Sequence, residues 1–127
     1  MGFYVGVYLF AIPKRNLAAY KKMCSKANKI WMELGALGYS QCVGDDLKVK
    51  SGMGVSFTKV AQAKAGETVI FSWILYRSRA HRDAVLKKIM KDPRIQKMCN
   101  SKMPFDCKKM AYGGFNTIVS SKYKVTK

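Results

Sequence analysis

Three adjacent residues, His81, Arg82 and Asp83, combine a base, a cation and a carboxylate at the start of a predicted helix. A histidine beside a carboxylate can act as a general base, and an arginine can hold an anionic substrate. Adjacent helical residues do not face each other, however, so all three cannot converge on one point. In the structural alternative, Asp83 favours the helix dipole and Arg82 pairs with a carboxylate elsewhere.

Asp106 follows a proline and a phenylalanine where a loop leads into the last predicted strand. Partial burial would raise the pKa of this carboxyl group and suit it to acid–base work. Alternatively, Asp106 forms an Asx-turn or pairs with Arg82 or Arg94. Arg94 itself is either a salt-bridge partner or a pocket cation, and the sequence leaves both roles open.

Trp73 and Tyr112 could line a pocket between the sheet and the helices, although aromatic residues on strands most often belong to the core. The sequence predicts no metal site, because Asp45 and Asp46 lack further ligands and the cysteines form no CxxC pair. It also contains no nucleophile elbow or phosphate loop, so no cofactor is predicted, and enzymatic activity is left open. The candidate ligand-binding residues are Trp73, Arg82, Asp83, Arg94, Asp106 and Tyr112.

Alternation and helical periodicity predict the elements that must position these side chains. A strand over 3–12 is apolar on both faces, and a helix over 17–35, capped by Asn16, carries a single apolar stripe. The segment 48–66 is basic and glycine-punctuated, which indicates a protruding flap or hairpin insertion. The other expected elements are strands over 38–46, 55–60, 69–76 and 110–119, a helix over 79–91 capped by Ser78, a short helix begun by Asp92 and Pro93, and a bulge or close backbone approach at Gly113 and Gly114.

This order predicts a single α+β domain over 1–127: a ferredoxin-like four-stranded antiparallel sheet with helices on one face. Two helices can cover only one face, and the opposite face still carries large apolar side chains. Burying each of them stabilises by about 1.5–3 kcal/mol, and a wet face would exceed the apolar patch usual for a monomer. The sequence therefore predicts a homodimer with the two sheets packed face to face.

The net charge of +17 comes from nineteen lysines and only five arginines, which are spread along the chain. Nucleic-acid readers concentrate basic residues and rely on arginine, so nucleic acid is not the expected partner, although the charge does not exclude it. No apolar run reaches the roughly 20 residues of a membrane span. A signal peptide has a positive residue before its apolar run, and the run 3–12 has none. A cytoplasmic protein with reduced cysteines is therefore expected.

Seven motifs follow one another along nearly the whole chain: GA at 35–36, CVGDD at 42–46, ETVIFSWI at 67–74, SRAHRD at 78–83, DPR at 92–94, MPFD at 103–106 and MAYGGF at 110–115. In this order they resemble the YbaA-like family of short bacterial proteins in the dimeric α/β-barrel superfamily. Four residues depart from the family pattern, which has proline, asparagine, glycine and arginine at the positions of Arg77, Leu86, Cys107 and Lys109.

The resemblance implies a dimeric α/β barrel built from two four-stranded sheets, but it supplies no reaction. Relatives in the wider superfamily include cofactor-free monooxygenases, haem enzymes and small-ligand binders, and fold alone does not transfer a function. We therefore expect a homodimer that binds a small organic molecule in a cleft of each protomer. The alternatives are a basic nucleic-acid-associated module and a structural or interaction dimer without a ligand.

Overall fold

The computed structural model describes residues 3–121. Its centre is one four-stranded sheet in which every neighbouring pair of strands is antiparallel, in the order β2-β3-β1-β4. The two central strands pair along their whole length, because both are apolar on both faces. The strands are β1 (Tyr4–Pro13), β2 (Gly38–Val43), β3 (Glu67–Tyr76) and β4 (Ala111–Asn116).

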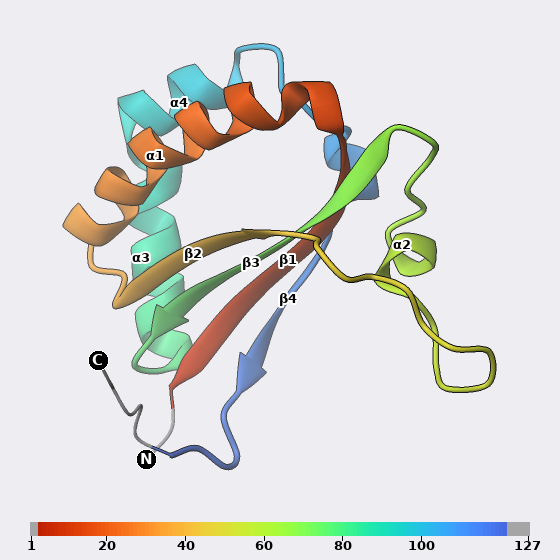
Figure 1. Cartoon of the computed structure of the whole chain (residues 1–127). Coiled ribbons are helices and arrows are strands. Elements are labelled where there is room, and N and C mark those ends of the chain that lie inside the picture. Colours follow the sequence, from red (N-terminus) through yellow and green to blue (C-terminus); the bar gives the residue numbers. More distant parts are fainter. Residues whose placement is uncertain (1–2, 122–127) are drawn as a thin grey trace, which may run out of the picture.

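Three helices lie on one face of this sheet, which confirms the predicted α+β arrangement (Figure 1). None of the helices within 3–121 is long and apolar enough to cross a membrane. A shorter helix, α2, lies beyond one end of the sheet, away from the other helices (Figure 1). The helices are α1 (Leu17–Glu33), α2 (Phe57–Val60), α3 (Arg79–Lys91) and α4 (Pro93–Cys99), with 3-10 turns η1 (Lys14–Asn16) and η2 (Cys107–Lys109).

The buried core lies between the helices and the sheet. Alternate residues of β1 and β3 point into it, as do buried residues of the apolar stripe predicted for α1. Two clusters share this layer, one nearer α3 and α4 and one nearer the start of α1. Their central members are Ile74, Tyr76, Ile30, Val85, Ile89 and Ile95 in the first, and Phe10, Ile12, Ile70, Tyr20 and Cys24 in the second.

Helix starts are fixed by caps, and two of the three predicted caps are confirmed. The Ser78 hydroxyl accepts a hydrogen bond from the His81 amide, and the Asp92 carboxylate accepts one from the Arg94 amide, with Pro93 at the first helical position. The prediction for Asn16 is wrong. Its side-chain amide donates to the carbonyl of Pro104, 88 positions away, so this residue ties the start of α1 to a distant loop.

In Figure 1 the chain that carries α2 extends beyond the end of the sheet. The expected strand at 55–60 is wrong. Phe57 begins the short helix α2, because the Ser56 hydroxyl accepts from the Lys59 amide and favours a helical turn. Leu47 and Phe57 share a hollow with Val69 and thus cover one end of the sheet face that the long helices leave bare.

Both edge strands are shorter than predicted. Strand β2 ends at Val43 and the chain bends at Asp45, while β4 ends at Asn116. The register through Gly113 and Gly114 is continuous, so there is no bulge. The close approach is made by the side chain of Tyr4, whose ring lies 2.6 Å from the place where a Cβ on Gly114 would stand. Only glycine leaves room for that ring.

The face of the sheet away from the long helices, here called the open face, is largely apolar. Glu67, at the start of β3, is the one charged strand residue on it. Phe71 is 41% exposed and Phe115 is 59% exposed on it. A chain with 24 basic residues thus places none among these side chains. The open-face residues are Val5, Val7, Leu9, Ala11, Ser40, Cys42, Phe71, Trp73, Leu75, Ala111, Gly113 and Phe115.

Candidate functional site

A cavity of about 290 Å³ lies between the sheet and the helices α1, α3 and α4. We call it the core cavity. Strands β1, β2 and β3 form its floor, and the three helices with the loop before η2 form its walls. Its volume is at the lower end of the roughly 300–1,000 Å³ of ligand pockets, which suits a molecule of one or two rings.

Methionine and aromatic side chains make up most of the lining of the core cavity. Five of the eight methionines of the chain lie there, and no charged side chain does among the described residues. Methionine is flexible and polarizable, so such a wall adapts to the shape of an apolar guest. The methionines are Met23, Met90, Met98, Met103 and Met110, and the aromatic residues are Tyr8, Phe10, Tyr20, Trp31, Tyr39 and Phe105.

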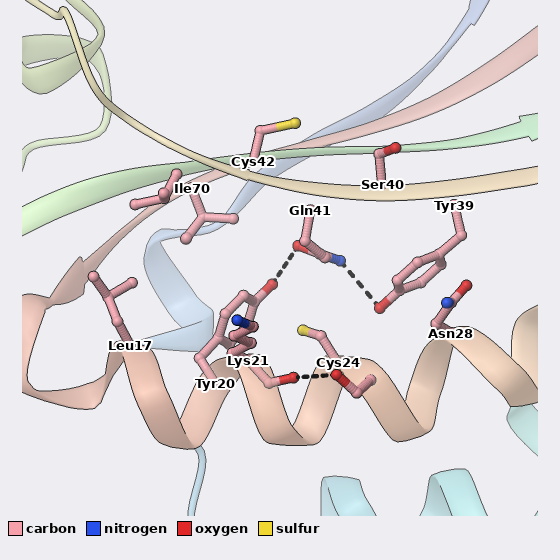
Figure 2. Close-up of a pocket in the computed structure, with 12 residues that line it drawn as sticks. Leu17, Tyr20, Lys21, Cys24, Asn28, Tyr39, Ser40, Gln41, Cys42 and Ile70 are labelled. Atoms are coloured by element: carbon pink, nitrogen blue, oxygen red, sulfur yellow. Dashed lines mark hydrogen bonds between the residues drawn. The ribbon is translucent and has the colours of Figure 1, made fainter.

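A short hydrogen-bonded chain closes the side of the cavity that faces β2. The Tyr20 hydroxyl donates to Oε1 of Gln41 at 2.6 Å, and Nε2 of Gln41 donates to the Tyr39 hydroxyl at 3.1 Å (Figure 2). These three residues and Cys24 line both the core cavity and a second, more open space of about 560 Å³ between α1 and β2. They form the boundary between this edge groove and the cavity.

The titratable groups at this boundary are held neutral. Burial raises the pKa of Tyr20, of Tyr39 and of the Cys24 thiol. The tyrosines therefore remain hydrogen-bond donors at physiological pH, and Cys24 remains a thiol instead of the thiolate that acts as a nucleophile. This side of the cavity can bind and orient a guest, but it offers no general base.

A second polar region lies where the cavity meets the other end of β1. The rings of Tyr8 and Tyr112 stack with centroids 6.1 Å apart, and Tyr8 lines the cavity. The guanidinium carbon of Arg82 lies 5.1 Å from the centroid of the Tyr4 ring. Of the six predicted ligand-binding residues, Arg82 and Tyr112 are thus the two that lie beside tyrosines of the sheet.

Trp73 lies elsewhere. It pairs with Val7 and Ser40 on the open face, whereas the neighbouring Ile74 points into the core. The expectation that Trp73 lines a pocket between sheet and helices is therefore wrong, since strand residues alternate between faces. Trp31 of α1 is the tryptophan that lines the core cavity.

Arg82 and Asp83 pair with each other, with 2.7 Å between Nε and Oδ1. We expected adjacent helical side chains not to meet, but near a helix start the long arginine side chain folds back onto its neighbour. His81 has a structural role, because its Nδ1 accepts a hydrogen bond from the Arg77 amide and its ring packs edge-on against Tyr76.

Asp106 is exposed and accepts a hydrogen bond from the Lys108 amide at 3.0 Å. It therefore forms the turn that begins η2, the alternative to an acid–base role. Its neighbour Phe105 does line the core cavity and stacks on Phe10, with centroids 4.1 Å apart.

Arg94 forms ion pairs with two carboxylates, at 2.9 Å to Asp92 and 3.0 Å to Glu33. It thereby ties the start of α4 to the end of α1. Hydrogen bonds from Arg94 lower the pKa of Asp92 to about 2. Because the folded-state pKa is lowered, the stabilisation from ionised Asp92 is complete above about pH 4 and is lost as the pH falls towards 2.

The substitution Asp92→Asn should lower the melting temperature at pH 7 by about 1–4 °C, since exposed ion pairs contribute little and asparagine preserves the cap. The difference from the unsubstituted protein should become small near pH 2, where Asp92 is about half protonated. Thermal unfolding followed by circular dichroism at both pH values measures this. Asp46→Asn, which removes the same charge outside the ion pairs, should show no such pH dependence; an equal response of both variants would contradict the assignment.

Sequence reasoning missed Tyr20, Tyr39, Gln41 and Tyr76 as candidate site residues. A signal was present, because alternation places tyrosines among the apolar residues of β1, β2 and β3 on the helix-covered face. A tyrosine in such a position has a hydroxyl that needs a partner inside the protein.

Comparisons with known proteins agree with this architecture. Residues 3–107 match the family described as "Protein of unknown function (DUF1428)". The "Uncharacterized protein YbaA" of Escherichia coli (strain K12) is 40% identical over 116 residues, which are 91% of this chain and 97% of that protein. The relative of the same name from Shigella flexneri gives the same values.

A crystal structure of a dimeric ferredoxin-like protein from an uncultured marine organism shares the fold, with a TM-score of 0.52 and 12% identity. The match covers 95% of this chain and 100% of the other, so the predicted ferredoxin-like fold is confirmed. The predicted resemblance to YbaA-like proteins is confirmed as well, and this chain belongs to the DUF1428 family.

Proposed function

We propose that this protein is a homodimer in which each protomer binds a small, largely apolar organic molecule in the core cavity. The observation that carries the proposal is the lining: five methionines and six aromatic residues surround about 290 Å³, with no charged side chain among the described residues. A well-formed apolar pocket with a few converging polar groups is the usual form of a ligand site.

The polar groups at the boundary fit binding better than catalysis. Tyr20, Gln41 and Tyr39 hydrogen-bond one another, so their donors and acceptors are largely used within the protein. The thiol of Cys24 is kept protonated by burial, which raises its pKa. The four residues form the boundary between the cavity and the edge groove.

The second half of the proposal is that the open face packs against the same face of a second copy. Its strand residues are mostly apolar and none is basic in a chain of net charge +17, which is what an interface between copies requires. Phe57 of α2, which is 53% exposed, lies beside Val69 and Phe71 and continues this surface at one end. The dimeric ferredoxin-like protein of similar fold supports the same assembly.

Ligand-observed nuclear magnetic resonance with naphthalene and indole tests the cavity. Both should bind at one site per protomer, since they are neutral and of the right size. Met98→Trp, which fills the cavity from α4, should weaken binding at least about tenfold, as the loss of roughly 1.4 kcal/mol of contact energy implies.

The matched control is Met53→Trp, which adds the same ring at a residue that is 76% exposed in the segment 48–66. This variant should bind both compounds as the unsubstituted protein does. Failure of both compounds to bind the native protein, or equal binding by Met98→Trp and the native protein, would count against the cavity as a ligand site.

A further inference from the structure

The hydroxyl of Tyr76 is buried and has no hydrogen-bond partner among residues 3–121. The residue is 1% exposed, so bulk water does not satisfy the group from outside. Buried hydroxyls without a partner are costly and therefore uncommon, and phenylalanine would fill the same space without that cost. The Tyr76 hydroxyl thus needs a hydrogen-bond acceptor that a bound ligand can supply.

Two glycines bring a second tyrosine hydroxyl to the same place. Gly6 and Gly114 are direct partners across β1 and β4, so their missing side chains leave a bare patch on the helix-covered face. The Tyr76 ring lies over Gly6, with Cε2 3.5 Å from the position of an added Cβ, and the Tyr4 ring lies over Gly114. Opposed Cβ positions in such a pair are about 4.5–5.5 Å apart, so the two rings end over adjacent positions.

Arg82 places a positive charge beside these two hydroxyls. Its guanidinium lies over the Tyr4 ring, and only Nε forms a hydrogen bond within the described part of the chain, to Asp83. The charge of Arg82 lowers the pKa of Tyr76, although burial outweighs it and the pKa is raised overall. We call the group formed by Tyr4, Tyr76 and Arg82 the tyrosine–arginine corner.

The corner adjoins the core cavity along two elements. On β3, Ile74 lines the cavity and Tyr76 is the next residue on the same face. On α3, Leu86 lines the cavity and Arg82 lies one turn before it on the same side of the helix. A molecule whose apolar body occupies the cavity can therefore present a polar end to the corner.

We propose that the tyrosine–arginine corner binds a carboxylate, and that the ligand of this protein is an organic acid with an apolar body. This inference rests on the proposed function of the core cavity. Each tyrosine hydroxyl can donate one O–H, and the guanidinium has donors and no acceptor. The corner therefore offers several hydrogen-bond donors beside a positive charge, which a carboxylate complements and a cation does not. At the opposite boundary Tyr20, Gln41 and Tyr39 hydrogen-bond one another, whereas the buried Tyr76 hydroxyl at the corner has no partner within residues 3–121.

The test compares 2-naphthoate, 2-naphthamide and naphthalene, which share one apolar body and differ in the polar end. The native protein should bind the carboxylate at least about tenfold more tightly than the amide, because hydrogen bonds to charged groups are the stronger ones. Tyr76→Phe and Arg82→Gln should each weaken binding of 2-naphthoate about tenfold or more and leave naphthalene within about twofold, as measured by titration calorimetry or nuclear magnetic resonance.

Arg79→Gln is the matched control, since it removes the same charge from an exposed position in the first turn of α3. It should leave the preference for 2-naphthoate intact. Equal affinity for carboxylate and amide would contradict carboxylate binding at the corner, and so would 2-naphthoate binding that Tyr76→Phe and Arg82→Gln do not change. Neither result would contradict ligand binding in the core cavity. Absence of binding by all three compounds would remove the proposed function itself, and the inference with it.

Discussion

Replacing Val7 by lysine should convert the proposed dimer into monomers. Val7 pairs with Trp73 and Gly113 in the middle of the open face, so both copies would bring an ammonium group into one apolar interface. An unpaired buried charge costs roughly 3–5 kcal/mol, and two of them should raise the dissociation constant at least about 10³-fold. Sedimentation velocity should show a single 14.3 kDa species for the variant and twice that mass for the native protein.

The control for this experiment is Ala18→Lys, which adds the same charge on the exposed side of α1. It should sediment as the dimer does. Circular dichroism of Val7→Lys should retain the native spectrum, because a charge on an uncovered sheet face is solvated in the monomer. A native protein that sediments as a monomer at every concentration would contradict the pairing, whatever the variants do.

Phe10→Ala should destabilise the protomer by about 3–5 kcal/mol, a large part of the stability of a domain of this size. Phe10 is 1% exposed and its ring packs against those of both Tyr20 and Phe105, so truncation leaves a hole that the neighbours cannot close. Because Phe10 lines the core cavity, the substitution also joins that hole to the cavity. Urea unfolding of the monomeric Val7→Lys protein measures the loss without a contribution from assembly.

Phe115→Ala in the same monomeric background is the comparison, because it removes the same ring from a residue that is 59% exposed on the open face. Its free energy of unfolding should change by less than about 1 kcal/mol. In the native background, by contrast, Phe115→Ala should weaken the dimer. Similar losses for Phe10→Ala and Phe115→Ala in the monomer would show that the two sheet faces are not as different as described.

The regular elements were predictable because their patterns are periodic. Two-sided apolar alternation identified β1 and β3, and the stripe that contains Tyr20, Cys24 and Trp31 identified α1. The prediction for the segment 55–60 was wrong because Val55 and Phe57 alternate like the apolar residues of a strand, whereas the hydrogen bond that the Ser56 hydroxyl accepts from the Lys59 amide favours a helical turn. The partner of Asn16 lies far along the chain, where no local pattern reveals it.

The candidate site was less predictable, because a cavity depends on the distance between layers and not on the order of residues. Sequence reasoning chose charged residues first, yet Arg94 and Asp106 fix helix and turn starts in the structure. Every lysine described is exposed, so the charge of +17 lies outside both the cavity and the strand positions of the open face. Nucleic-acid binding stays a prediction from that charge, to be checked by its dependence on salt.

The positions of the two tryptophans give the protein two separate optical reporters. Trp31 lies in the wall of the core cavity, and Trp73 lies in the middle of the open face. Each is the sole indole in its layer, so a variant that keeps only Trp31 has emission sensitive to a guest, and one that keeps only Trp73 has emission sensitive to assembly. Ligand occupancy and dimer formation can thus be followed independently, and any thermodynamic linkage between them measured directly.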